Sequence, residues 1–315
     1  MASVLEAVLL YVLAYFFRVL DYIKIWRTSK SRTIRMDNVL VEHIQIPSRD
    51  AGRTISAIRY SPKGFEGPLP VHLNWHASGW VLKRLGLDRH MCVRFAQELR
   101  CVVLDCDYRK APEHKFPAAH NDTEDAVLYV LANPSLYDTK RITVGGSSAG
   151  GSMALSISAH LGPERIRGCF SLYPVTYITE LERTKKTLIA PNPRFRSGIV
   201  IPDLVIKFFI RAYVGSDMSQ INEPRLSPLY YDESRFPKHV FIACGDADSL
   251  YPNACKMLDK LHHHVGSELR STRKMISIPQ EAHEFNNFPE VDISYEWRHK
   301  VEDTAMGMIR ASWQD

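Results

Sequence analysis

Residues 144–151 read Val-Gly-Gly-Ser-Ser-Ala-Gly-Gly, and this stretch narrows the choice of fold for the whole chain. It follows an apolar run typical of a strand and precedes a pattern typical of a helix. A strand that passes through glycines into a helix is found in P-loops, dinucleotide-binding turns and nucleophile elbows. The stretch lacks the Lys of a P-loop, and its glycine spacing does not match GxGxxG. It does match G-x-S-x-G over residues 146–150.

Two adjacent serines in this stretch compete for the place of a nucleophile. A nucleophile on a tight strand-to-helix turn needs small residues two positions before and two positions after it. Ser148 has Gly146 and Gly150 at these positions, whereas the position two after Ser147 is Ala149. The spacing therefore favours Ser148, and the N-terminus of the following helix would point at the reacting oxygen.

A serine nucleophile needs a base and an acid that orients this base. In folds with this elbow, the acid and then a histidine follow later strands. The strand-like run 239–245 precedes Asp246 and Asp248, and the run 274–279 precedes His283. We expect these side chains to lie together, because the carboxyl ends of parallel strands meet at one edge of a sheet. The residues alone leave Asp246 and Asp248 both open as the acid, with helix capping as the alternative role of each.

An acyl-transfer site also needs backbone N–H donors for the oxyanion. One donor is expected from Ala149, directly after the nucleophile. Further donors are expected from the loop after the third strand, which reads His76-Ala77-Ser78-Gly79. Small residues in that loop would let backbone N–H groups approach a substrate.

Short apolar runs alternate with helical patterns from Val39 to the C-terminus. The alternation predicts an α/β fold with a mostly parallel central sheet and helices on both faces. The expected strands are 39–46, 54–60, 71–75, 102–108, 142–146, 169–175, 239–245 and 274–279. The expected helices are 88–100, 118–132, one from about 149, one near 202–213, and 293–312.

Residues 176–235 interrupt this alternation and are rich in Pro, Arg and aromatic residues. We therefore expect an α/β core of residues 36–175 and 236–315, with residues 1–35 and 176–235 forming a helical cap over one end of the sheet. Six aromatic side chains in this cap would either shape an apolar pocket or form the core of the cap. They are Tyr11, Tyr15, Phe16, Phe208, Phe209 and Tyr213.

Residues 7–17 form an uncharged apolar run that is shorter than the roughly 20 residues needed to span a bilayer. A basic leader and a cleavage site are absent from this region, which argues against a secretory signal. Two interpretations remain. The favoured one is a cytoplasmic protein whose N-terminal helix packs its apolar face over the site. The alternative is peripheral membrane contact through residues 1–25, on the endoplasmic reticulum.

Charge and cysteine content exclude several classes of function. The net charge is +5 over 315 residues, and Lys and Arg are scattered, so we expect no nucleic-acid partner. The six cysteines form no CxxC pair, and four of them, Cys101, Cys106, Cys169 and Cys244, lie in or beside strand-like runs, so we expect buried thiols. The three histidines at 262–264 would point in different directions on a helix. We therefore expect no metal and no cofactor, and the sequence indicates no oligomeric state.

Residues 107–119 read DYRKAPEHKFPAA, and with this motif the chain resembles the hormone-sensitive-lipase branch of the α/β-hydrolases, the alpha/beta hydrolase fold-3 group. The resemblance covers about residues 70–310 and implies an α/β-hydrolase fold with a cap. It implies a serine hydrolase of carboxylic esters with the triad Ser148, Asp248 and His283. It also selects Asp248 over Asp246, because the acid of this group lies two positions before the place held here by Leu250.

Two departures from this group concern the site. The group has HGGG where this chain has His76-Ala77-Ser78-Gly79, and by position the donors would come from Ser78 and Gly79. The group favours GDSAGG, whereas Ser147 stands here in place of the Asp. This change removes a charge beside the nucleophile but no catalytic group.

The expected substrate is a small to medium ester with an apolar acyl or aromatic part. The same triad would also serve an acyltransferase, a cyclase or an amidase such as a deacetylase or formamidase. A third interpretation is a ligand receptor without activity. Such receptors of this branch lack the histidine, so the presence of His283 argues against this interpretation.

Overall fold

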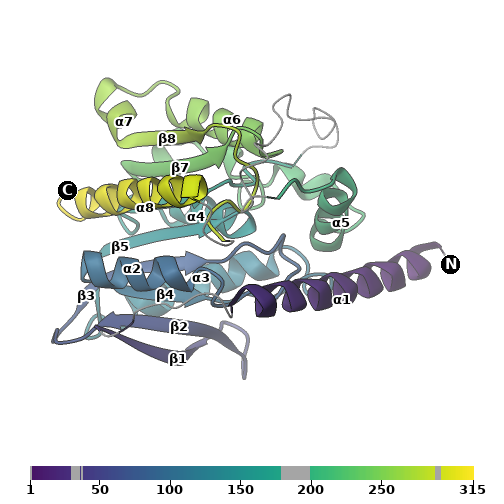
Figure 1. The fold of residues 1–315 in the computed structure, drawn as a ribbon, viewed down its shortest axis with the longest axis horizontal. Helices are drawn as coiled ribbons and strands as arrows, with labels where there is room; N and C mark the ends of the chain where they lie inside the picture. The colour runs from purple at the N-terminus through teal and green to yellow at the C-terminus, as the bar shows by residue number, and fades with distance from the viewer. Residues whose placement is uncertain (1, 30–35, 37, 179–198, 288–291) are drawn as a thin grey trace.

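The computed structural model of the chain describes residues 2–29, 36, 38–178, 199–287 and 292–315. An eight-stranded sheet forms its centre, in the order β1-β2-β4-β3-β5-β6-β7-β8 (Figure 1). The strands are β1 (Val39–Pro47), β2 (Thr54–Pro62), β3 (Leu69–Trp75), β4 (Val102–Cys106), β5 (Tyr137–Ser147), β6 (Gly168–Leu172), β7 (His239–Gly245) and β8 (Arg273–Ile278). The pairs β1–β2 and β2–β4 are antiparallel and the other pairs are parallel, so the predicted α/β fold class is confirmed.

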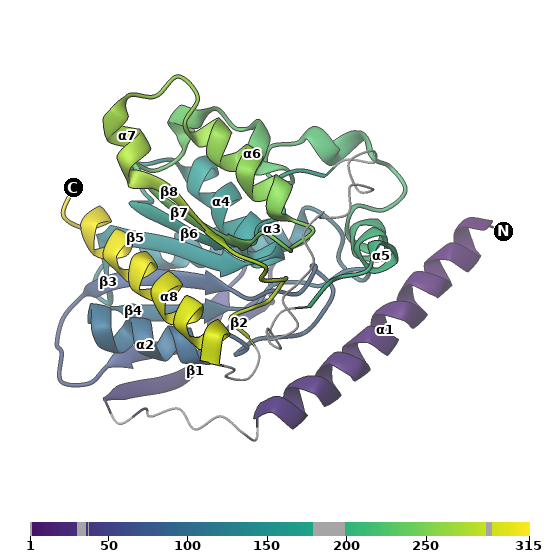
Figure 2. The same ribbon diagram turned by 45° about the horizontal axis from the view of Figure 1, so that its top comes forward.

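Helices cover both faces of the sheet. Helices α2 (Arg89–Leu99) and α8 (Asp292–Ser312) lie side by side on one face, and α3 (Ala118–Leu131), α4 (Ala149–Leu161) and α6 (Tyr251–Leu261) lie on the other (Figure 2). Helices α1 (Ala2–Ser29) and α5 (Asp203–Val214) lie beyond the carboxyl ends of the parallel strands. The remaining elements are α7 (Ser267–Thr272) and the 3₁₀ turns η2 (Ser219–Asn222), η3 (Pro228–Tyr230) and η4 (Glu233–Arg235).

The expected elements are present, with shifts at some ends. The expected strand 169–175 ends at Leu172, because Tyr173 has a positive φ of 35° and turns the chain out of the sheet. The apolar residues after Leu172 remain buried although they are outside the strand, which explains why the sequence predicted a strand that is too long. Helices α6 and α7 were not predicted. Of the residues expected to form the cap, 1, 30–35 and 179–198 lie outside the described residues.

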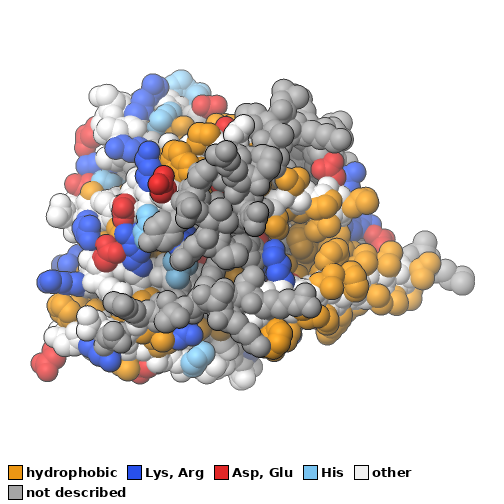
Figure 3. Space-filling view, in the orientation of Figure 1, with side chains coloured by type: hydrophobic (Ala, Val, Ile, Leu, Met, Phe, Trp, Pro, Cys, Tyr) orange, Lys and Arg blue, Asp and Glu red, His pale blue; other side chains and the backbone are white. Residues whose placement is uncertain are grey.

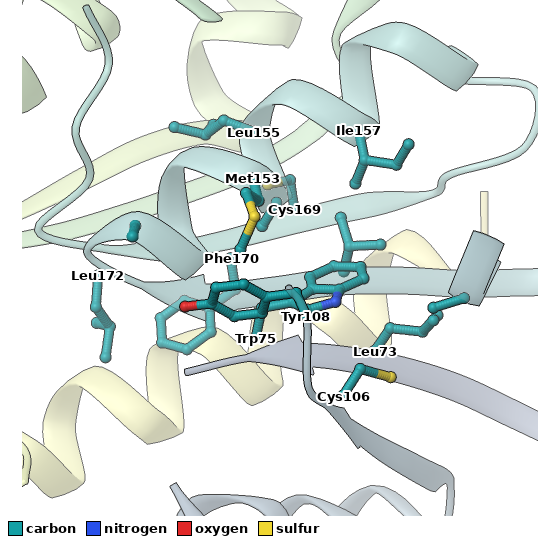
Figure 4. Close-up of a cluster of buried hydrophobic side chains, with 14 of the residues drawn as sticks. Leu73, Trp75, Cys106, Tyr108, Met153, Leu155, Ile157, Cys169, Phe170 and Leu172 are labelled. Atoms are coloured by element: carbon teal, nitrogen blue, oxygen red, sulfur yellow. The ribbon is translucent and has the colours of Figure 1, made fainter. Parts of the chain in front are cut away.

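Part of the core lies between the sheet and α4, and buried residues of α2 and α8 extend it on the other face. Figure 4 shows Trp75 from β3 and Phe170 from β6 beneath Met153 and Ile157 of α4. Full burial of each large apolar side chain contributes roughly 1.5–3 kcal/mol, so this layer fixes α4 firmly on the sheet. The four thiols expected to be buried are buried, as is Cys92.

Helix α1 differs from the favoured interpretation. It contacts the body through one stripe that contains Ala14, while most of its apolar side chains face outward. The expectation that its apolar face covers the site is therefore wrong for most of the helix. Tyr11, Tyr15 and Phe16 are among the exposed residues. No helix within the described residues is long and apolar enough to cross a membrane.

Candidate active site

Ser148 lies at the junction between β5 and α4, in the strained backbone conformation φ 54° and ψ −118°. Gly146 and Gly150, which flank Ser148, leave no room for a side chain. A Cβ atom on Gly146 would lie 2.5 Å from the carbonyl oxygen of Trp75, and one on Gly150 would lie 1.9 Å from the same oxygen. The end of β3 therefore packs directly on the elbow, and only glycine fits at both positions.

The structure brings Ser148, His283 and Asp248 into one chain of hydrogen bonds. Nε2 of His283 lies 3.1 Å from Oγ of Ser148, and its Nδ1 lies 2.7 Å from Oδ2 of Asp248. All three residues are buried. Asp248 is held in turn by the backbone N–H of Leu250, which donates to its Oδ1 at 2.8 Å. This geometry can activate a serine hydroxyl for attack on a carbonyl carbon.

The two acids that spacing left open have different surroundings. Asp246 does not reach the histidine and instead accepts a hydrogen bond from the backbone N–H of Gln280 at 2.6 Å. It ties the turn after β7 to the turn after β8. Of the two candidates, Asp248 is the one that contacts His283.

The charge on Asp248 sets the protonation of His283. Burial by itself would lower the pKa of the imidazole, but the carboxylate of Asp248 outweighs burial and raises this pKa above its ordinary 6.5. The backbone of His283 pairs with that of Ile199, whose N–H donates to the carbonyl oxygen of His283 at 2.7 Å. Both contacts hold the imidazole in place.

The expected oxyanion donors lie beside Ser148. Ser78 and Gly79 line the same pocket as Ser148. The backbone N–H groups of Ser78, Gly79 and Ala149 have no acceptor among the described residues, so they are available to an anion. Gly79 has a φ of +56°, and a Cβ atom there would lie 2.5 Å from the ring of Phe209 on α5.

The DYRKAPE motif holds this loop in position, a role that the sequence did not indicate. Nε2 of His76 lies 3.2 Å from Oδ1 of Asp107, which also binds Nζ of Lys110. The hydroxyl of Tyr108 donates to the carbonyl of His76 at 2.8 Å and contacts the hydroxyl of Ser78. The Lys110 ammonium keeps Asp107 ionised, with its pKa well below the usual range despite burial. The side chain of Ser78 is thereby turned toward Tyr108.

Ser147 is fully buried as the last residue of β5. Its hydroxyl finds no hydrogen-bond partner among the described residues. Ser147 thus lies next to Ser148 in the chain and makes no hydrogen bond to His283 or Asp248.

A cavity of about 250 Å³ opens above Ser148. Its walls are largely apolar, and two segments far apart in the sequence supply them. Helix α1 contributes Phe17 and Leu20, and the chain leading into α5 contributes Ile199, Val200 and Pro202. Of the six aromatic residues expected for the cap, Phe209 lines this cavity, while Phe208 and Tyr213 are buried. Phe17 was missed because the sequence does not indicate which side of α1 faces the protein.

A buried ion network lies next to the histidine and was also missed. Arg84 binds both carboxylate oxygens of Asp21 on α1, at 2.8 and 2.5 Å, and it binds Glu284 as well. Burial would raise the pKa of Glu284, but Arg84 holds it below its ordinary value. Helix α1 is thus linked through one arginine to the residue that follows His283.

The sequence of the chain matches a known protein family. The family described as alpha/beta hydrolase fold matches residues 72–286. The chain belongs to the alpha/beta hydrolase fold-3 family. The resemblance carried by the elbow and by residues 107–119 is thereby confirmed.

The relatives include characterised esterases. The chain is 31% identical to carboxylesterase NlhH of Mycobacterium tuberculosis, over 70% of this chain and 71% of that protein. It is 28% identical to versiconal hemiacetal acetate esterase of Dothistroma septosporum, over 59% of this chain and 58% of that protein. The match to an AB hydrolase superfamily protein of Schizosaccharomyces pombe has 29% identity and covers 70% of this chain and 65% of that protein. The chain thus spans less than two thirds of the length of several relatives.

Solved structures agree on the architecture. The esterase of Pyrobaculum calidifontis superimposes with a TM-score of 0.75 at 27% identity, covering 95% of this chain and 93% of that one. EstE1, a thermophilic carboxylesterase cloned from a metagenomic library, gives a TM-score of 0.80 at 23% identity, covering 96% and 98%. At that identity EstE1 supports the fold alone.

Proposed function

We propose that the protein hydrolyses carboxylic esters and that Ser148, His283 and Asp248 are its catalytic triad. The observation that carries the proposal is the continuous chain of hydrogen bonds from Ser148 through His283 to Asp248 at the floor of an apolar cavity. Membership in a family whose named relatives include carboxylesterases supports the reaction class.

The geometry suggests the role of each group. Oγ of Ser148 attacks the carbonyl carbon and passes its proton to Nε2 of His283, which then gives it to the leaving alcohol. Water, deprotonated by the same nitrogen, attacks the acyl-enzyme and releases the acid and the serine. Asp248 stabilises the imidazolium that forms in each half-reaction. The N–H groups of Ser78, Gly79 and Ala149 would stabilise the oxyanion, which forms twice.

The size of the cavity favours a short acyl group. A volume of about 250 Å³ is below the usual range for drug-sized ligands, roughly 300–1,000 Å³. Two of the relatives are named for acetate esters, versiconal hemiacetal acetate esterase and ethyl acetate hydrolase. The proposed substrates are therefore esters with a short, apolar acyl part.

We also propose that residues 1–35 and 176–235 act as the cap of this site. The support comes from the described residues of both segments. The ring of Phe17 on α1 packs in a tilted arrangement against that of Phe208 on α5, with 5.3 Å between ring centroids, and Phe209 reaches the loop of Ser78 and Gly79. Both helices thus border the cavity above Ser148.

The adjacent serines provide a matched test. Ser148→Ala is expected to lower turnover of p-nitrophenyl acetate and butyrate by about 10⁶-fold and to abolish labelling by a fluorophosphonate, because the nucleophile is lost. Ser147→Ala removes a hydroxyl one position away and is expected to keep both properties. Thermal unfolding of both variants checks that they fold. Turnover or labelling that persists in Ser148→Ala would rule out the proposed nucleophile.

A further inference from the structure

Helix α1 carries a broad exposed apolar surface, which we call the outer face of α1. Most of the exposed large apolar side chains among the described residues belong to it. They are Val4, Leu5, Val8, Leu9, Tyr11, Val12, Tyr15, Phe16, Val19, Leu20, Tyr22, Ile23 and Trp26. Figure 3 shows hydrophobic side chains covering the projecting rod of α1 and continuing toward α5. Patches of this kind mark interaction sites, because exposed apolar area is costly in water.

The charged side chains of α1 pair with residues of the protein body, on the side of the helix away from the outer face. Glu6 forms an ion pair with Arg211 of α5 at 2.5 Å, and Arg18 donates two hydrogen bonds to the carboxylate of Glu113. Asp21 pairs with Arg84, as described above. Lys24 is half-buried, and its pKa is lowered by burial although Glu284 and Asp21 lie near it.

A surface helix of a globular protein normally turns its apolar stripe inward and its charges outward. Helix α1 does the reverse between Val4 and Ile23: Arg18 and Asp21 are buried, Glu6 is half-buried and paired with Arg211, and the exposed residues are uncharged. Because the charged groups are held by ion pairs with the body, the helix cannot simply roll over. The outer face is therefore built to meet an apolar environment.

The chemistry of the outer face fits a lipid surface better than a protein. A protein interface makes about one hydrogen bond for each 100–200 Å². The outer face contains few polar side-chain groups, namely the hydroxyls of Tyr11, Tyr15 and Tyr22 and the indole of Trp26. Tyr and Trp are the side chains enriched at the boundary between lipid and water. The sequence of residues 27–36 also contains four Lys or Arg and no Asp or Glu, which complements anionic headgroups.

The mouth of the cavity opens at the edge of the same surface. Leu20 belongs both to the outer face and to the cavity wall. On the opposite side of the mouth, Val200 lines the cavity and is 60% exposed, and Leu204 is 79% exposed. The exposed apolar surface thus extends across both sides of the entrance to Ser148.

We propose that the outer face of α1 docks the protein on a bilayer that contains anionic phospholipid, with the mouth of the cavity against the bilayer. The assignment of the ester rests on the proposed function: an apolar ester dissolved in the bilayer enters directly between α1 and α5. Helix α1 lies in the interface and does not span the bilayer, with its inner stripe still bound to the body.

Vesicle binding tests the docking without relying on catalysis. The Ser148→Ala protein is mixed with sucrose-loaded vesicles of phosphatidylcholine with 30% phosphatidylserine, which are then sedimented. We expect it to sediment with the vesicles. Adding Leu5→Gln, Leu9→Gln and Val12→Gln is expected to lower binding at least about tenfold, because these exposed side chains would lose their apolar contact with lipid. Raising the salt concentration is expected to weaken binding, because it screens the phosphatidylserine headgroups.

A matched control places three glutamines on other faces, at Leu40, Leu128 and Leu136, which are also exposed. This variant is expected to bind as strongly as its parent. Equal thermal unfolding temperatures would establish that both triple variants fold. Failure of the parent to sediment overturns the proposal. The proposal is also overturned if light scattering finds that the parent is a dimer and that the α1 changes dissociate it, because a second copy of the chain then covers the outer face.

With active protein, the α1 changes are expected to slow hydrolysis of the acetate ester of a long-chain alcohol, dissolved in vesicles, at least about tenfold, while hydrolysis of soluble p-nitrophenyl acetate stays unchanged. Vesicle binding without any hydrolysis by the active protein would contradict the proposed function and leave the docking surface standing. Equal hydrolysis of the vesicle-borne ester by both proteins would overturn entry from the bilayer.

Discussion

At the scale of single residues, the sequence spacing selected Ser148 as the proposed nucleophile but could not select one of the two candidate acids. Ser148 could be selected because steric crowding at the elbow restricts its neighbours, and Gly150 has no room for a Cβ atom. Asp246 and Asp248 follow the same strand, so both reach the correct edge of the sheet. Only the path of the chain through the turn decides which carboxylate faces His283. That information is three-dimensional and has no counterpart in the spacing.

The contact between Asp248 and His283 is expected to determine the acid limb of the pH–rate profile. Nε2 of His283 must be neutral to accept the serine proton, so kcat/KM is expected to fall as the pH drops through a pKa above 6.5. In Asp248→Asn the main group that opposes the effect of burial is lost and only the weaker effect of Glu284 remains, so the imidazole pKa falls and the acid limb moves to lower pH. The rate itself is expected to drop by about 10³–10⁴-fold. Asp246→Asn is the control and is expected to keep the profile of the wild type.

At the scale of elements, the oxyanion loop and α5 are packed against each other at Gly79 and Phe209. The contact joins a loop after β3 to a helix more than a hundred positions later, so no local pattern could predict it. The sequence indicated that small residues are needed in this loop, but not what they are packed against. Phe209 belongs to the proposed cap, so we expect the cap and the proposed oxyanion donors to depend on one another.

A double-mutant cycle measures this dependence. Gly79→Ala places a methyl group against the ring of Phe209 and strains a positive φ, so we expect kcat/KM to fall about 10- to 100-fold. Phe209→Ala alone widens the cavity and is expected to cost less. In the double variant the steric conflict is gone, and part of the loss is expected to be restored. Strict additivity of the two effects would show that the loop and the helix act independently.

At the scale of the whole molecule, the alternation of strands and helices was sufficient to predict the sheet and its two helical layers. It was insufficient for α1, because an apolar run does not reveal which of its sides meets the protein. The same limit applies to buried charge. Asp88 and Asp105 are fully buried, and Nδ2 of Asn74 donates to both, at 3.1 and 3.0 Å. In the sequence they read as ordinary polar residues beside a helix and within a strand.

These two carboxyls predict how the stability of the molecule depends on pH. Burial raises the pKa of Asp88 to about 6 and that of Asp105 to about 8, from 3.8. The folded state therefore keeps protons that the unfolded state has lost, and their contribution to the free energy of unfolding declines as the pH rises from about 4 to 8.

Asp88→Asn removes one of these groups and lowers the pKa of Asp105, because the neighbouring negative charge is gone. Urea unfolding at pH 5 and pH 8 should show the wild type losing more stability than the variant, by on the order of 1–3 kcal/mol. The m-values should agree, which would exclude a change in the unfolded state. An equal loss in both proteins would mean that Asp88 is ionised in the folded state, with a charge compensated by contacts other than Asn74.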